Sequence, residues 1–304
     1  GGLIHPLSPR GKLVYRGLEG LEASNQLIDS ACQTVGSSSV VLSNAILRCA
    51  QTSKHVEQLQ KTARELPELF AWLDPADMSQ AGDSASSVVG EEEEESAAKV
   101  LGALRMSNGC RVIHVPSYLQ GLYLNCQQSV ASMNKVSLEW KEVPSNLEQV
   151  LDTFDTVIFS AGAAIFQDYL PSQDADEKDQ NHVFPVHLLR GQSIEFVSRC
   201  NDPSKTIKDA FLCGKYISPL PSKNGTSRVL VGATHEFKKE ASSQEDVVDG
   251  LKSATQFMAP HLWDESEYAM DRITSGYRVQ SQRGHLGRLP LLGKMEIPYF
   301  LPQH

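Results

Sequence analysis

The sequence lacks paired cysteines. Its six cysteines form no C-x-x-C pair and match no zinc-ligand spacing, and several lie in apolar patterns where free thiols pack like small hydrophobic side chains. This pattern excludes a disulfide scaffold and a zinc module, so we expect a reducing compartment and no metal site. The cysteines are Cys32, Cys49, Cys110, Cys126, Cys200 and Cys213.

The sequence also lacks long apolar runs and an excess of basic residues. No stretch approaches the roughly 20 apolar residues that a transmembrane helix needs. Lys and Arg number 28 against 37 Asp and Glu, which gives a net charge of −9 at pH 7. We therefore expect neither a membrane anchor nor a nucleic-acid partner. Because the first residue is Gly1 rather than Met, we expect an initial segment to be missing from view.

Two stretches are typical of insertions. Residues 78–96 are rich in Ser, Gly and Asp and contain the run Glu91 to Glu95, and residues 171–182 are rich in acidic and amide side chains. Like charges at this density repel one another and cannot be buried, so both stretches are predicted to be solvated, flexible loops.

The remaining sequence alternates helix and strand patterns. An apolar helical face is predicted after Ser53, and the apolar pair Val112 and Ile113 predicts a strand followed by a helix from Ser117 to about Ser129. In that helix the predicted buried face comprises Leu119, Leu122, Tyr123 and Cys126. The fold class is therefore α/β or α+β, and strand-to-helix order favours a doubly wound parallel sheet. Other predicted elements are strands at 155–159, 193–197 and 228–232 and a helix at 244–258.

Small residues follow several predicted strands. Ser160, Ala161 and Gly162 come after the continuous apolar run of 157–159, where a backbone without bulky side chains lets a ligand approach closely. The triplets at 190–192, 232–234 and 276–278, and the segment Leu289-Pro290-Leu291-Leu292-Gly293, are each consistent with a turn.

The order of these pieces resembles the D-amino-acid oxidase and glycine oxidase superfamily, including plant versions of it. The resemblance covers almost the whole chain and implies an FAD-binding Rossmann-like domain interleaved with a substrate domain built on an antiparallel sheet. It implies removal of hydride from the carbon next to an amine nitrogen of an amine or amino acid, with FAD as acceptor. Its implied cofactor-binding residues are Gly1, Gly2, His5, Val115, Ser160, Ala161, Gly162, Pro290 and Gly293.

The resemblance also implies domain ranges and a substrate residue. Segments 1–50, 108–170 and 270–304 are expected in the FAD-binding domain, and 51–107 and 183–269 mainly in the substrate domain. Arg278 matches the arginine that binds the substrate carboxylate in glycine oxidases, and a guanidinium is suited to that task because it is planar and permanently charged. A structural ion pair remains the alternative for this residue.

The histidines leave alternatives open. His5 and His114 lie beside segments that the resemblance places near flavin, but each is also typical of a packing histidine. His235 and Glu236 could pair as acid and base, although a strand-end His-Glu is commonly polar surface.

The sequence departs from the family pattern in two places. It contains no G-x-G-x-x-G between a strand and a helix, which is the dinucleotide-binding fingerprint. It also stops at His304 before the family's Gly-rich flavin-contact turn. Two alternatives therefore stand beside the oxidoreductase: a truncated, non-catalytic form that cannot bind FAD, and an unrelated binding domain, which a strand at 155–159 outside a parallel sheet would favour. The compartment stays open between cytoplasm and plastid.

Overall fold

The computed structural model describes most of the chain, and the chain divides into two units. The boundary between the units falls within two long strands, β7 and β11, described below. The first unit comprises Gly1–Ser137, Gln192–Thr234 and Ser242–Thr274, and the second comprises Leu138–Gly191, His235–Ala241 and Ser275–His304. The described residues are 2–78, 99–133, 136–139, 153–158, 160, 162–163, 186–199, 205–237 and 242–281.

The larger of the two described sheets has eight strands, in the spatial order β11-β7-β10-β9-β8-β3-β5-β4. β10 pairs antiparallel with β7 and β9, and β5 pairs antiparallel with β3 and β4, whereas β3 and β8 run parallel. The sheet is therefore mixed, and most of its pairing is antiparallel. The strands are β3 (Ile46–Cys49), β4 (Phe70–Leu73), β5 (Ala103–Met106), β7 (Val186–Ser198), β8 (Ala210–Cys213), β9 (Lys215–Lys223), β10 (Thr226–Gly232) and β11 (Tyr268–Ser281).

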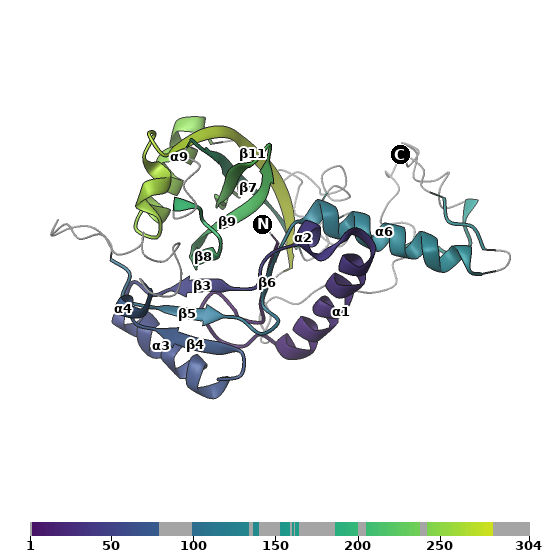
Figure 1. Ribbon diagram of the computed structural model, residues 1–304, viewed down its shortest axis with the longest axis horizontal. Helices are drawn as coiled ribbons and strands as arrows, with labels where there is room; N and C mark the ends of the chain where they lie inside the picture. Colours follow the sequence, from purple (N-terminus) through teal and green to yellow (C-terminus); the bar gives the residue numbers. More distant parts are fainter. Residues whose placement is uncertain are drawn as a thin grey trace, which may run out of the picture. The chain divides into compact units, whose positions relative to one another are not determined.

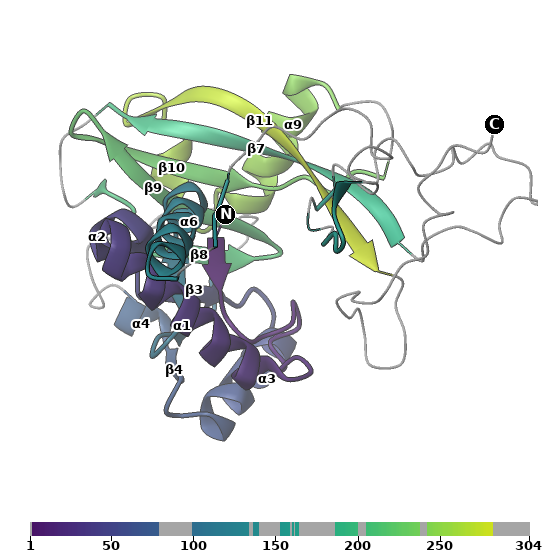
Figure 2. The ribbon, with the colours of Figure 1, turned by 90° about the vertical axis from the view of Figure 1, so that its right-hand side faces the viewer.

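In the first unit this sheet has an apolar face and a polar face. Because successive side chains of a strand point to opposite faces, Ile194 and Phe196 of β7 enter the core while Ser193 and Glu195 face the other way. Val231 of β10 joins the same core. Helix α9 (Gln244–Thr255) lies along β9 and β10 (Figure 2) and covers the apolar face with buried Val247 and Leu251. The polar side chains of these strands, such as Ser193 and Glu195, therefore lie on the face opposite α9.

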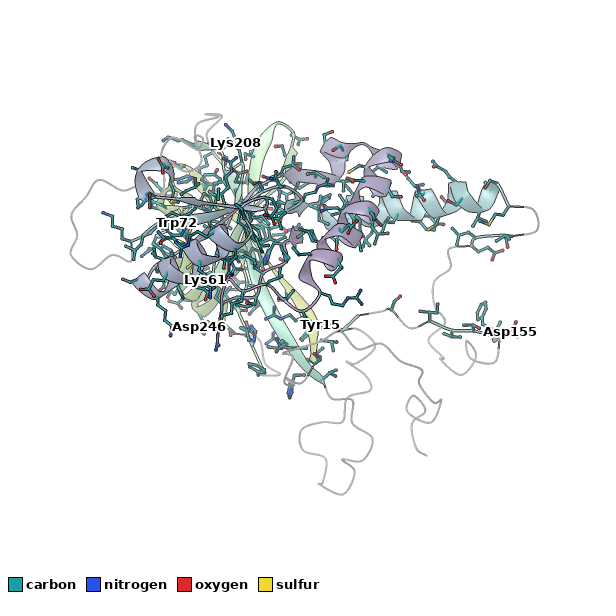
Figure 3. The ribbon with its side chains drawn as sticks, turned by 90° about the horizontal axis from the view of Figure 1, so that it is seen from below. Tyr15, Lys61, Trp72, Asp155, Lys208 and Asp246 are labelled. Atoms are coloured by element: carbon teal, nitrogen blue, oxygen red, sulfur yellow. The ribbon has the colours of Figure 1, made fainter. Side chains whose placement is uncertain are left out.

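Helices cover the first unit's other strands. Helix α3 (Ser53–Glu65) confirms the helix predicted after Ser53, but its N-cap is Thr52, whose Oγ1 accepts a hydrogen bond from the His55 N–H at 3.2 Å. It packs on β4 and β5 (Figure 1), and Figure 3 shows Lys61 of α3 and Trp72 of β4 in this part of the unit. The short helix α4 (Pro75–Met78) contacts β4, whereas the 3₁₀ helix η3 (Pro260–Trp263) packs in the core under α9, where Leu262 is buried.

A three-stranded antiparallel sheet of order β1-β6-β2 forms the rest of the first unit. Its strands are β1 (Gly2–Ile4), β2 (Val41–Ser43) and β6 (Arg111–Ile113). Three helices accompany it, and α1 and α6 lie side by side in Figures 1 and 2. These helices are α1 (Gly17–Val35), α2 (Ser37–Val40) and α6 (Val115–Ala131).

The predicted buried face of α6 is partly wrong. The helix follows β6 as expected, but Leu119 is 56% exposed and Cys126 is also exposed. The face towards α1 passes instead through Gly121, where a Cβ would come within 2.8 Å of Ala31. A glycine at the crossing lets the two backbones approach closely, and this close approach, not the most apolar stripe, sets the rotation of α6.

Other local predictions are also corrected. Residues 155–158 form no strand and Ile158 is 84% exposed, because no described strand pairs with this segment and a buried strand needs neighbours on both sides. The doubly wound parallel arrangement is wrong for the described residues, in which only β3 and β8 are paired in parallel. The triplets at 190–192 and 276–278 lie inside strands, not turns. The insertion predicted at 78–96 starts too early because Met78 is 1% exposed, and its remainder and 171–182 lie outside the described residues.

Within the described ranges, no helix combines the length and the apolar character needed to cross a membrane.

Candidate functional site

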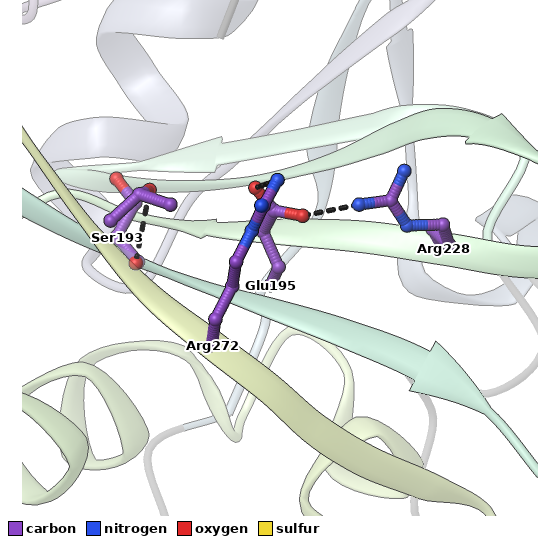
Figure 4. Close-up of polar contacts among 5 residues, drawn as sticks. Ser193, Glu195, Arg228 and Arg272 are labelled. Atoms are coloured by element: carbon purple, nitrogen blue, oxygen red, sulfur yellow. Dashed lines mark hydrogen bonds and ion pairs between the residues drawn. The ribbon is translucent and has the colours of Figure 1, made fainter.

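The polar face of the first unit carries one carboxylate between two guanidinium groups (Figure 4). Glu195 Oε1 accepts a hydrogen bond from Arg272 Nη2 at 2.9 Å, and Glu195 Oε2 pairs with Arg228 Nη2. Glu195 is only 7% exposed, whereas the side chain of Arg272 is 60% exposed. The single negative charge of Glu195 offsets only one of the two positive charges, and the remaining positive charge favours anionic groups on this face.

Hydroxyl groups continue this polar face next to Glu195. The Ser193 and Tyr216 hydroxyl oxygens lie 3.2 Å apart, and the Thr274 hydroxyl donates to the Ser193 carbonyl oxygen at 3.5 Å. Gly232, one of the small residues singled out by sequence, is needed here because a Cβ would lie 2.3 Å from Ser193 Oγ and 2.8 Å from Tyr216 Oη. Because Gly232 has no side chain, the hydroxyl groups of Ser193 on β7 and Tyr216 on β9 can meet over β10, the strand between them.

Two of the predicted cofactor-binding residues lie against each other in the first unit. Gly2 pairs with Ile113 in the antiparallel ladder between β1 and β6, and a Cβ on Gly2 would lie 3.0 Å from Val115 Cγ2. His114, which precedes Val115, has its Nδ1 2.8 Å from Ser117 Oγ. Burial lowers the pKa of His114, and the positive charge of Arg228 lowers it further. The start of α6 therefore lies within the electrostatic reach of the polar face.

His5 lies beyond the other end of β1, beside a buried arginine. The His5 Nδ1 accepts a hydrogen bond from the Leu7 N–H at 3.2 Å. Arg48 is 6% exposed, and its Nη1 donates to the carbonyl oxygens of Ser8 and Pro9 at 2.9 and 2.8 Å. Burial lowers the pKa of Arg48 to about 10, and burial followed by the Arg48 charge lowers the pKa of His5 to about 4. Arg48 therefore holds the loop after His5 in place, and burial together with the Arg48 charge keeps His5 neutral.

His5 should make the folded state sensitive to mild acid. Its pKa is about 4 when folded, against 6.5 as the ordinary value, so the unfolded chain takes up the proton first as the pH falls. The corresponding stability is present above pH 6.5 and is lost as the pH falls towards about 4, and it amounts to about 3 kcal/mol. Urea unfolding at several pH values measures this loss. The His5→Asn variant retains an acceptor for the Leu7 N–H without titrating, and it should show a shallower loss; equal slopes in the two proteins would contradict the prediction.

The second unit contains the predicted substrate residue. Arg278 of β11 is exposed, and its Nη2 lies 2.6 Å from His235 Nδ1. The His235 and Phe237 rings meet edge to face with centroids 5.4 Å apart. No described atom lies within 4 Å of a Cβ built on Gly276, two residues before Arg278. The guanidinium is thus held on one side and has open space beside its own strand.

The opposite face of the same strands carries a buried ion pair. Arg190 Nε donates to Glu236 Oε2 at 3.0 Å, and both side chains are less than 10% exposed. The Tyr277 ring lies over this pair, with its centroid 6.0 Å from Arg190 Cζ. The sequence hypothesis of a His235–Glu236 acid–base pair is therefore wrong, because neighbouring residues of an extended chain point to opposite faces and each bonds a different arginine.

Two further predicted cofactor residues, Ser160 and Gly162, belong to the second unit. Ser160 and Gly162 are exposed, and nothing described lies within 4 Å of a Cβ built on Gly162. Gly1, Ala161, Pro290 and Gly293 lie outside the described residues. No three His, Cys, Asp or Glu side chains converge on a metal position within the described ranges.

Sequence reasoning missed the Arg228–Glu195–Arg272 network. A period-two pattern in Ser193 to Phe196 signals that Glu195 shares a face with Ser193. The pattern does not identify the arginines, because they come from β10 and β11, more than 30 positions along the chain.

Comparison with known proteins gives matches in structure. No protein-family model matches the chain, and no curated protein matches it in sequence. Glycine oxidase from Geobacillus kaustophilus is similar with a TM-score of 0.59 and 18% identity over 96% of this chain and 71% of that one. Iminodiacetate oxidase from Chelativorans sp. matches with a TM-score of 0.54 and 15% identity over 91% and 73% of the two chains. L-Proline dehydrogenase from P. horikoshii matches with a TM-score of 0.59 and 9% identity over 92% of this chain and 70% of that one.

These likenesses bear on the fold alone, and the strand expected at 155–159 does not form in the described residues 155–158. The matches extend over at least nine-tenths of this chain in all three cases. Identities below a fifth show the fold alone. The chain therefore has the mixed α/β fold of glycine oxidase, iminodiacetate oxidase and L-proline dehydrogenase.

Proposed function

We propose that this protein is an FAD-dependent oxidoreductase that oxidises a C–N bond of a small amine or amino acid. The observation that carries the proposal is Arg278, an exposed guanidinium held by His235 at 2.6 Å, in a chain with the fold of amino-acid-acting oxidases and dehydrogenases. When bound, FAD supplies the acceptor for the hydride that leaves the carbon next to nitrogen.

The chain's own residues bind and orient the substrate. Arg278 has N–H groups beyond the one that faces His235, and two of them can bind a carboxylate at two points. Fixing the carboxylate fixes the distance and orientation of the neighbouring carbon relative to the acceptor, which is the protein's main contribution in cofactor enzymes.

The residues that would hold FAD fit the cofactor only in part. Gly2 and Val115 lie together, and we propose them as flavin contacts with Gly1, His5, Ser160, Ala161, Gly162, Pro290 and Gly293. The proposal keeps 1–50, 108–170 and 270–304 in the FAD-binding domain and 51–107 and 183–269 in the substrate domain. A pyrophosphate needs a glycine-rich helix start with free N–H groups, and no described helix begins with G-x-G-x-x-G.

That missing fingerprint favours a second candidate, a form of such an enzyme that does not itself bind FAD. The fingerprint occurs nowhere in the 304 residues. In this case the sheet and its polar face would persist, but the chain would not catalyse oxidation.

An absorbance measurement separates the two candidates. The purified chain is incubated with excess FAD, freed of unbound cofactor and scanned for the visible band of oxidised flavin. Retention of the band, followed by bleaching with an amino acid under anaerobic conditions, is the result expected for the oxidoreductase. A folded sample that retains no flavin would refute it for this chain and support the second candidate.

A further inference from the structure

We propose that His235 is a positioning residue that holds the Arg278 guanidinium ready for a substrate carboxylate; this rests on the proposed function. Arginine can only donate, so the contact at 2.6 Å requires an unprotonated Nδ1 on His235. The imidazole is then neutral and carries its proton on Nε2. It binds one N–H of the guanidinium without neutralising the positive charge, which a carboxylate partner would do.

The two residues come from strands on either side of β7. The order of the sheet is β11-β7-β10, with Arg278 on β11 and His235 in the segment that follows β10. That segment is anchored to β7 by Arg190 N–H to Glu236 O at 3.0 Å and Glu236 N–H to Arg190 O at 2.9 Å. Strands two places apart are roughly 10 Å from each other, so the contact must pass over the strand between them.

Gly191 makes that passage feasible. Since Arg190 faces Glu236, strand alternation turns residue 191 to the face that carries His235 and Arg278. A glycine there leaves β7 without a side chain at the position directly opposite His235. The glycine of the 190–192 triplet is thus explained by the long reach of Arg278 and not by a turn.

The position of the imidazole is restricted from two further sides. The Phe237 ring packs on it with centroids 5.4 Å apart. Behind it, on the other face, the buried Arg190–Glu236 pair fixes the backbone of the segment. An exposed arginine otherwise samples many rotamers, and ordering it costs side-chain entropy. His235 orders the Arg278 side chain before the substrate binds, and this preorganisation raises the affinity for the substrate carboxylate.

The test compares His235→Asn with His235→Leu. These side chains have nearly the same shape, but only Asn has an acceptor, Oδ1, at the position of Nδ1. If the full chain is active, we expect His235→Leu to raise KM for an amino acid about 10-fold with little change in kcat, and His235→Asn to restore most of the loss. The His55→Leu variant, at an exposed position of α3, serves as the control for loss of a histidine.

A second measurement decides the proposal even if the chain binds no flavin. In ¹⁵N-histidine-labelled protein, His235 should be the Nε2–H tautomer, and Gly191→Val and Arg278→Met should both change its Nδ1 resonance. Titration with acetate as the probe should shift the same resonance in the wild type, and Asn should retain acetate affinity that Leu loses about 10-fold. An Nδ1–H tautomer, or acetate affinity equal in the Asn and Leu variants, would overturn the positioning role whatever the flavin experiment gives.

Discussion

Replacement of Arg278 by alanine is expected to lower kcat/KM for an amino acid about 100-fold. The substitution removes two charge-assisted hydrogen bonds to the substrate carboxylate, and together they contribute about 3 kcal/mol. Arg278→Lys should recover only part of the loss, because a lysine keeps the charge without the planar fork. Steady-state kinetics with the flavin-loaded protein measures both effects. Arg278 is exposed, so neither variant should unfold the protein.

Two controls make this result specific to carboxylate binding. Arg64, exposed on α3, can be replaced by alanine to remove the same charge far along the sequence from β11, and kcat/KM should not change. An amine substrate without a carboxylate should be turned over equally by the wild type and Arg278→Ala. If Arg278→Ala reduces turnover of both substrates alike, the arginine acts in structure and not in recognition.

Replacement of Glu195 by alanine is expected to lower the free energy of unfolding by about 3 kcal/mol, because it leaves the partly buried Arg228 without its counter-ion. Arg272, the second partner, would lose its hydrogen bond of 2.9 Å. Glu195→Gln keeps the acceptor oxygen and should cost less. Urea denaturation at neutral pH gives the change in free energy.

The matched control for Glu195 is Glu65, a carboxylate on the surface of α3. Its ion pair with Lys61 spans 3.6 Å between side chains that are about 60% exposed, and pairs of this kind contribute well under about 1 kcal/mol. A loss of stability for Glu195→Ala no greater than that for Glu65→Ala would mean that water already screens the two arginines, and that the polar face tolerates net charge without its carboxylate.

The two positions also differ in what they test. Glu195 belongs to the first unit and its effect is on stability, independent of any cofactor. Arg278 belongs to the second unit and its effect is on substrate recognition, which exists only if the proposed oxidation takes place. A negative result for the Glu195 variants and a negative result for the Arg278 variants would therefore have separate causes.

Sequence by itself determined the local features, because these depend on neighbours within one turn or one strand. The capped, amphipathic helix after Thr52, the helix that follows Ile113 and the alternation of Ser193 to Phe196 all follow from such short-range rules. The order of short motifs also indicated the fold that the chain shares with glycine oxidase at 18% identity. It pointed to Arg278 but not to the residue that holds it.

Only the tertiary structure decided which of these elements met. The run at 155–158 is apolar enough for a strand, yet it forms none, because strand pairing depends on partners elsewhere in the chain. His235 and Arg278 are 43 positions apart and become neighbours only through the order β11-β7-β10. Composition and periodicity indicate the helix or strand to which a residue belongs. A functional site is formed by residues from several elements, so its composition depends on long-range packing that local sequence patterns do not encode.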